Sequence, residues 1–249
     1  MSAQRNEPSA RSRPEGRNDF TATHWTQIVL AAGQNGSAPA QEALEALCVR
    51  YWPAIYGFLR QKNHSPEDAA DLAQSFFGHL LSENALARAD RSKGRFRNFL
   101  LGALQRFLID ESRRNTAQKR GHGRVVLALD FSAVEERYLD EADPGLSAEQ
   151  LYDRRWAATV LETAFEELQA EFRAADQIAR FDYLKRFLSE EVGDGDYEAG
   201  AARLGITPKA VSSAVSRLRE RYRELVQRNV LATVAGPEEI GPEFRELFR

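Results

Sequence analysis

Apolar residues recur every three or four positions through most of the chain, which is the pattern of amphipathic α-helices. The clearest stripe begins after Gly94 and follows the spacing i, i+3, i+4, i+7, i+8, i+11 and i+12 without interruption. Its members are Phe96, Phe99, Leu100, Ala103, Leu104, Phe107 and Leu108. Comparable stripes predict helices over 41–60, 66–81, 148–172 and 178–188. The sequence therefore predicts an all-α fold.

Capping signals indicate where several of these helices begin. Ser65 precedes a proline and two acidic residues, and Ser147–Gln150 has the form of a capping box. Near the C-terminal end, a short helix is expected to stop at Gly205, and Thr207 would cap the next helix two residues later. A helix, a glycine turn and a capped helix with polar and basic outward positions predict a helix-turn-helix.

Segments without helical periodicity divide the chain into predicted regions. Residues 1–19 are rich in Arg, Ser, Pro and Asn, which predicts a disordered tail. Residues 20–120 form a first helical domain, and residues 147–235 form a second. The segment 121–146 lacks sustained periodicity and is interpreted as a partly extended acidic linker. Residues 236–249 are a C-terminal extension to which the sequence assigns no role.

Charge is strongly segregated, although the 249-residue chain has a formal net charge of only −3. Residues 91–124 hold ten basic and two acidic residues, and residues 203–228 hold seven basic and two acidic residues. Between them, residues 130–171 hold twelve acidic and three basic residues. Two basic segments around an acidic one favour two surfaces that bind a polyanion. Solvated helix faces would give the same pattern, so this alternative stays open.

Several classes of protein are disfavoured by what the sequence lacks. The single Cys48 excludes an internal disulfide, and the four histidines have no metal-ligand spacing. No phosphate-binding or nucleophile motif occurs, and no apolar run is long enough to span a membrane. We therefore expect a cytoplasmic binding protein with no catalytic residue, metal or cofactor and no membrane insertion. The acidic pairs Glu135–Glu136 and Asp140–Glu141 are the only enzymatic candidates, and they have no partner motif.

Three segments, in this order, resemble the extracytoplasmic-function (ECF) sigma factors of the sigma-70 family. They are PEDAADLAQSFFGHLL (66–81), FRNFLLGALQRFLIDESRR (96–114) and YEAGAARLGITPKAVSSAVSRLRERYREL (197–225). The first resembles region 2.2, which contacts the β′ subunit of core RNA polymerase. The second resembles regions 2.3 and 2.4, which open and read the −10 element. The third resembles region 4.2, which reads the −35 element, and the likeness extends over residues 40–230.

Other features resemble an ECF subgroup of planctomycete type. These are the opening THWTQIVLA, the acidic insert LALDFSAVEERYLDE and the C-terminal GPEEIGPEFRELF.

The resemblance implies three sets of binding residues, with no cofactor. The expected contacts with core polymerase are Asp68, Asp71, Gln74 and Ser75. The expected contacts with the −10 region are Arg97, Arg106, Asp110, Arg113 and Arg114. The expected contacts with the −35 region are Lys209, Ser212, Ser213, Ser216, Arg217 and Arg219. The implied partners are the β′ and β subunits, double-stranded and melted promoter DNA, and an anti-sigma factor or another regulator.

The chain also departs from the family pattern. Gln74–Ser75 stands where the family usually has Gln-Glu, and Ser212 and Ala214 stand where basic residues are usual. An alternative that the same helix-turn-helix allows is a free-standing DNA-binding regulator that acts without polymerase. Co-purification with core polymerase would distinguish the two.

The acidic stretch 130–143 carries six acids and one arginine and leaves three interpretations open. It is a solvated spacer, or it folds back on the basic segments, or it occupies a polymerase channel as the family's linker does.

Overall fold

The computed structural model describes residues 38–82, 94–117, 131–141, 143–193, 195–234 and 236–247. Within these ranges every regular element is a helix, which confirms the all-α prediction. The elements are α2 (Ala38–Gln61), α3 (Pro66–Ser82), α4 (Phe96–Ala117), α5 (Phe131–Glu141), α6 (Ala148–Ala174), α7 (Ile178–Leu184), η3 (Lys185–Leu188), α8 (Asp196–Leu204), α9 (Pro208–Leu231), η4 (Pro237–Glu239) and α10 (Ile240–Leu247). The predicted N-terminal tail and the segment THWTQIVLA lie outside the described residues.

The predicted helix starts are confirmed by their hydrogen bonds. The Asp68 amide donates to the Ser65 hydroxyl over 3.1 Å at the start of α3. Ser147 and Gln150 form the reciprocal capping box of α6, with N–O distances of 3.1 and 2.8 Å. Thr207 accepts the Ala210 amide over 3.2 Å at the start of α9. Each cap satisfies an amide that the first helical turn leaves without a backbone partner.

The interpretation of the acidic linker as partly extended is wrong over residues 131–141, which form α5. This helix packs on α2. Glu135 binds the Arg60 guanidinium through N–O distances of 2.8 and 3.0 Å and accepts the Tyr56 hydroxyl, and the Arg60 guanidinium lies over the Tyr138 ring. The Arg60 guanidinium offsets part of the negative charge of this segment, which reduces its self-repulsion and favours a docked helix.

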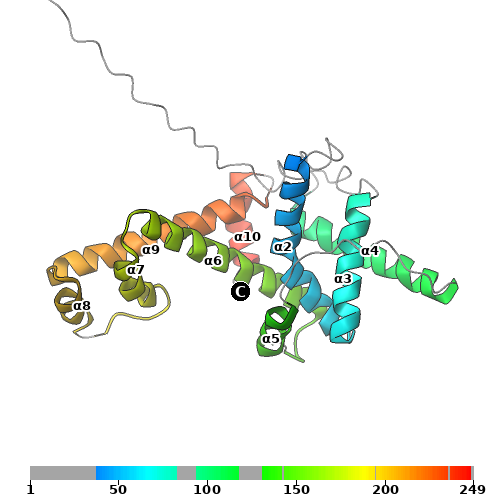
Figure 1. Cartoon of the computed structure of the whole chain (residues 1–249), viewed down its shortest axis with the longest axis horizontal. Coiled ribbons are helices and arrows are strands. Elements are labelled where there is room, and N and C mark those ends of the chain that lie inside the picture. The colour runs from blue at the N-terminus through cyan, green and yellow to red at the C-terminus, as the bar shows by residue number, and fades with distance from the viewer. Residues whose placement is uncertain are drawn as a thin grey trace, which may run out of the picture.

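Helix α6 joins the two ends of the molecule, as Figure 1 shows. Its N-terminal half lies against α2, where the rings of Tyr51 and Trp156 stack at 4.3 Å. Its C-terminal half lies along α9, where the Tyr222 hydroxyl donates to the Leu161 carbonyl over 3.1 Å. α8 and α7 lie at the far end of this pair, and α3 and α4 lie beyond α2 (Figure 1).

The buried side chains of the described residues form one continuous hydrophobic cluster. Tyr51 lies at its centre, because its ring contacts Trp156 of α6 and also meets Phe96 of α4 edge-on at 5.3 Å. The buried residues before and after residue 147, where the second domain was predicted to begin, therefore belong to the same cluster. The division into two domains with separate binding roles stays a prediction.

Candidate nucleic-acid interface

The helix-turn-helix is formed by α8, the turn at Gly205 and α9. Gly205 has φ +65° and ψ +33°, a left-handed conformation that glycine adopts without steric cost. The predicted stripe of α9 is buried at Val211, Val215, Leu218 and Leu225, whereas Tyr222 is half-buried. Gly200 lets the helices approach, since a Cβ there would lie only 3.0 Å from Val211 and Tyr183.

The start of α9 presents a short polar and basic surface to solvent. Lys209, Ser213, Ser216 and Arg217 are exposed, and Ser212 is half-buried. Ala214 is 5% exposed and packs in the core. This burial gives a physical reason for one departure from the family pattern, because a basic side chain at 214 would be buried without water.

Arg219 differs from its neighbours, because backbone oxygens already bind its guanidinium. Its Nε donates to the Phe187 carbonyl over 2.7 Å, and an Nη donates to the Glu190 carbonyl over 3.1 Å. These bonds hold α9 to the end of η3, where carbonyls lack helical partners. Arg219 is half-buried and binds the chain's own backbone in this structure, and its expected contact with DNA stays a prediction.

Two further basic residues of α9 are paired with the acidic segment. Arg221 binds Glu171 at 2.6 Å, and Arg228 binds Glu167 at 2.8 Å. The hydrogen bond from Arg221 lowers the pKa of Glu171. The acidic and basic segments of the sequence thus neutralise each other in part along the α6–α9 contact. The basic surface left for a ligand is smaller than the sequence count indicates.

Helix α3 places the expected polymerase contacts on its outer side. Asp68 and Asp71 are exposed, and Gln74 and Ser75 are half-buried. The opposite side is buried at Phe76, Phe77 and Leu80. Asp68 also accepts the Ser65 hydroxyl over 3.0 Å, so it takes part in the cap of its own helix.

Helix α4 carries the expected −10 residues, and the structure divides them. Arg106, Asp110 and Arg113 are exposed, with 3.7 Å between Arg113 and Asp110. Arg114 lies in α4, but its side chain is outside the described part. Arg97 is only 1% exposed, and the expectation that it faces DNA is wrong in this structure.

Arg97 is held in a buried ionic cluster with three carboxylates. Its guanidinium contacts Glu243 at 2.8 Å, Glu246 at 2.8 Å and Asp153. Burial alone would lower the pKa of Arg97, but the hydrogen bonds and charges of these carboxylates outweigh it and raise that pKa. Burial raises the pKa of Asp153. The four charged residues of this cluster lie on three helices: Arg97 on α4, Asp153 on α6, and Glu243 and Glu246 on α10. The cluster therefore ties α4 to α6 and to α10.

Sequence reasoning missed this cluster, because its acids lie far along the chain. Glu243 is fully buried, and it also binds Arg95, at 2.7 Å. The helical spacing of Phe244 and Leu247 predicts an apolar side for α10, and Glu243 lies next to that side. This spacing is the feature of the sequence that indicates a buried acid.

Of the two acidic pairs considered as enzymatic candidates, the structure describes the side chains of Glu135 and Glu136. The hydrogen bond from Arg60 lowers the pKa of Glu135, which makes Glu135 an ion-pair partner of α2. Glu136 is exposed, and the side chains of Asp140 and Glu141 are outside the described part. No group of three metal-ligating side chains is found among the residues that the structure places. Nor does any helix in that part have the length and apolarity of a membrane span.

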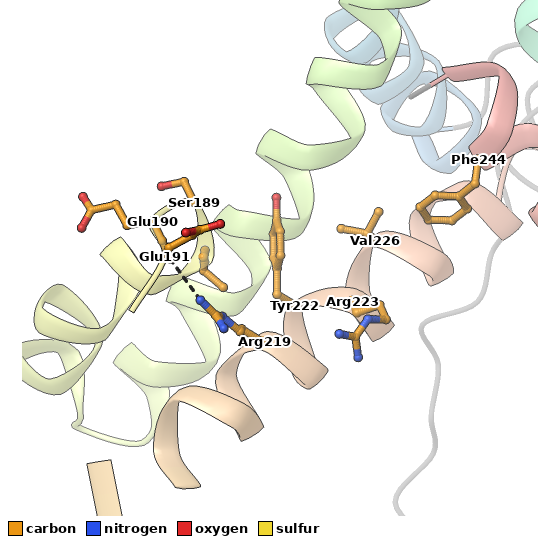
Figure 2. A pocket seen from close by; sticks show the side chains of 9 residues that line it. Ser189, Glu190, Glu191, Arg219, Tyr222, Arg223, Val226 and Phe244 are labelled. Carbon is orange, nitrogen blue, oxygen red and sulfur yellow. Dashed lines mark hydrogen bonds between the residues drawn. The ribbon is translucent and has the colours of Figure 1, made fainter. Parts of the chain in front are cut away.

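A pocket of about 450 Å³ lies between α9, the end of η3 and α10. Figure 2 shows Tyr222 and Val226 on its floor, with Phe244 of α10 at one end and Glu190, Glu191 and Arg219 at the other. The floor is apolar and the rim is charged. Helix α10 thus contributes a wall to the pocket as well as acids to the cluster on α4.

Comparison with known proteins finds no matching family model, no similar curated protein and no similar solved structure.

Proposed function

We propose that this chain is a sigma factor of the ECF type, which binds core RNA polymerase, directs it to a promoter and helps to open the DNA. It acts in the cytoplasm, where polymerase works, and it is not an enzyme itself. The observation that carries the proposal is the exposed surface at the start of α9, directly after the Gly205 turn. This surface exposes two basic residues, Lys209 and Arg217, and the small polar residue Ser213.

This surface suits a major groove. Small side chains such as Ser213 and Ser216 let the helix backbone approach base edges, and Lys209 and Arg217 are placed to neutralise phosphates. The capped N-terminus of α9 adds its positive helix dipole to the same end.

The exposed cations of α4 support a second contact with nucleic acid. Arg106 and Arg113 lie on the outer side of a helix whose other side is buried at Leu100, Leu104 and Phe107, and Phe107 packs against Phe76 of α3. The buried phenylalanines are core residues, so any contact with unpaired bases falls to exposed side chains. A binding site for core polymerase on the outer side of α3, around Asp71 and Gln74, completes the proposal.

The test is a pair of measurements on purified full-length protein. Binding to core polymerase should weaken by about 1–3 kcal/mol in the Asp71→Ala, Gln74→Ala double variant, the usual range for interface residues that matter. Arg217→Ala should weaken DNA binding for all sequences and reduce the salt slope by about one unit. Arg154→Ala is the matched control, because Arg154 is exposed on α6, away from α9.

Serine variants test base contact separately. Ser213→Ala or Ser216→Ala should change which promoter sequences are preferred, with a small effect on affinity for random DNA. If the protein binds DNA but never core polymerase, the free-standing regulator is the correct function. If it binds neither, the proposal fails.

A further inference from the structure

A row of three arginines runs along one side of α4. Arg95, Arg106 and Arg113 are separated by 11 and 7 residues, which correspond to about three and two whole turns. Arg95 directly precedes α4, and its carbonyl accepts the amides of Asn98 and Phe99, so its backbone is already part of the helix start. Arg106 and Arg113 are exposed, whereas the side chain of Arg95 is only 16% exposed.

Helix α10 covers the Arg95 end of this row. Arg95 contacts Glu243 at 2.7 Å and also contacts Glu246. The hydrogen bond from Arg95 lowers the pKa of Glu246, so Glu246 is charged at neutral pH. Two carboxylates therefore occupy the place that a phosphate would take on Arg95.

The attachment of α10 is of a kind that can be reversed. The helix has eight residues, too few to be stable without a docking surface. It is held by the apolar contacts of Phe244 and Leu247 and by its ion pairs. The chain that leads to it is held at Thr233, whose carbonyl accepts the Phe96 amide over 3.2 Å. Removing one partner of a buried ion pair is costly, but detachment of the whole helix returns the charges of Glu243 and Glu246 to water.

We propose that α10 is an autoinhibitory helix, which holds Arg95 with Glu243 and Glu246 until a nucleic-acid phosphate replaces them. Detachment would lengthen the cationic row of α4 from two residues to three. It would also take Glu243 and Glu246 away from Arg97, which would keep Asp153 as its partner. This inference rests on the proposed function, because it requires α4 to face DNA. The competing ligand is defined by its chemistry, a row of backbone phosphates.

The test measures binding of the full chain to a mixed-sequence DNA duplex at several salt concentrations. Glu246→Gln removes one of the two acids that hold Arg95, the double variant Glu243→Gln, Glu246→Gln removes both, and a chain that ends at residue 235 removes α10 altogether. Each additional phosphate contact should make the slope of log K against log [salt] steeper by about 0.9. Glu166→Gln is the control, since it removes the same charge from an exposed position on α6.

A second substitution identifies the cation that is released. Arg95→Ala should weaken DNA binding less in the wild-type chain than in the released chains, because in the wild-type chain a phosphate must first displace Glu243 and Glu246. In the released chains the same substitution should reduce the slope by about 0.9, the contribution of one phosphate contact. Urea unfolding shows which variants are folded. Glu246→Gln is the mildest change, because the Glu246 side chain is 48% exposed, and it should give part of the gain in slope, because Glu243 still binds Arg95.

Three results separate failure of the inference from failure of the proposed function. If the salt slope of the released chains becomes no steeper than that of Glu166→Gln, α10 is a structural clamp and the inference is overturned. The same holds if Arg95→Ala weakens DNA binding equally in the wild-type and released chains. If Arg106→Ala fails to weaken DNA binding in any chain, α4 does not face DNA, and the proposed function loses that surface whatever α10 does.

Discussion

Substitution of Arg97 gives the sharpest test of the ionic cluster, because the sequence and the structure assign it different roles. In Arg97→Ala, the fully buried Glu243 loses its 2.8 Å partner and Asp153 loses the cation that it contacts. A buried charge left without its partner destabilises a protein by about 3–5 kcal/mol. Arg95 stays within 2.7 Å of Glu243, so we expect the lower end, about 3 kcal/mol.

Urea denaturation followed by Trp fluorescence measures this effect. With a slope of about 2 kcal/mol per molar urea, the midpoint should fall by about 1.5 M. The double variant Arg97→Met, Glu243→Leu should recover at least half of the loss, because a buried ion pair can be replaced by apolar side chains of similar size. Arg106→Ala, an exposed position on the same helix, should change stability by at most about 0.5 kcal/mol.

The opposite result would refute the reasoning. If Arg97→Ala unfolds at the wild-type urea concentration and instead loses DNA affinity as Arg106→Ala is expected to, Arg97 is a DNA contact and the cluster does not stabilise the fold.

Three other substitutions test local features. Glu135→Gln should cost about 1–2 kcal/mol at pH 7, since it removes the charge that Arg60 binds. Arg60 holds the pKa of Glu135 below its unfolded value of about 4.3, so this stabilisation is present above that pH and is lost in acid; a cost that persists at pH 3 would contradict this. Gly205→Ala should cost about 1 kcal/mol through its left-handed backbone, seen as a lower melting temperature. Ser147→Ala should cost about 1 kcal/mol in urea unfolding, with Ser147→Asp close to wild type.

Features that depend on neighbouring residues could be predicted from the sequence. The caps at Ser65, Ser147 and Thr207 and the stop at Gly205 are all found where they were expected, because each needs only residues within one or two turns. The stripe of α4 is likewise buried at Phe96, Leu100, Leu104 and Phe107, with its other members half-buried.

Features that depend on distant residues could not be predicted in the same way. Arg97 and Glu243 are 146 positions apart, and nothing near Arg97 distinguishes it from the exposed Arg106. α5 was missed because its acids dominate the composition, although Phe131, Val134 and Tyr138 have helical spacing. Its charge is tolerated because Arg60 lies opposite, on a helix some seventy-five residues earlier. Whether the rest of 130–143 masks a basic segment or enters a polymerase channel stays a prediction.

The shared helix α6 has a consequence for the spacing of promoter elements. Its 27 residues form a spine of about 40 Å between the α2 end and the α7–α8 end of the molecule. On DNA, one added base pair displaces the next element by about 3.4 Å and rotates it by about 35°. In a sigma factor of this architecture, a promoter of different spacing could be read only if the packing of α2 and α4 on α6 rearranged, including the Tyr51–Trp156 stack and the Arg97–Asp153 ion pair. Tolerance to spacing would then be set by this packing and not by the length of a linker.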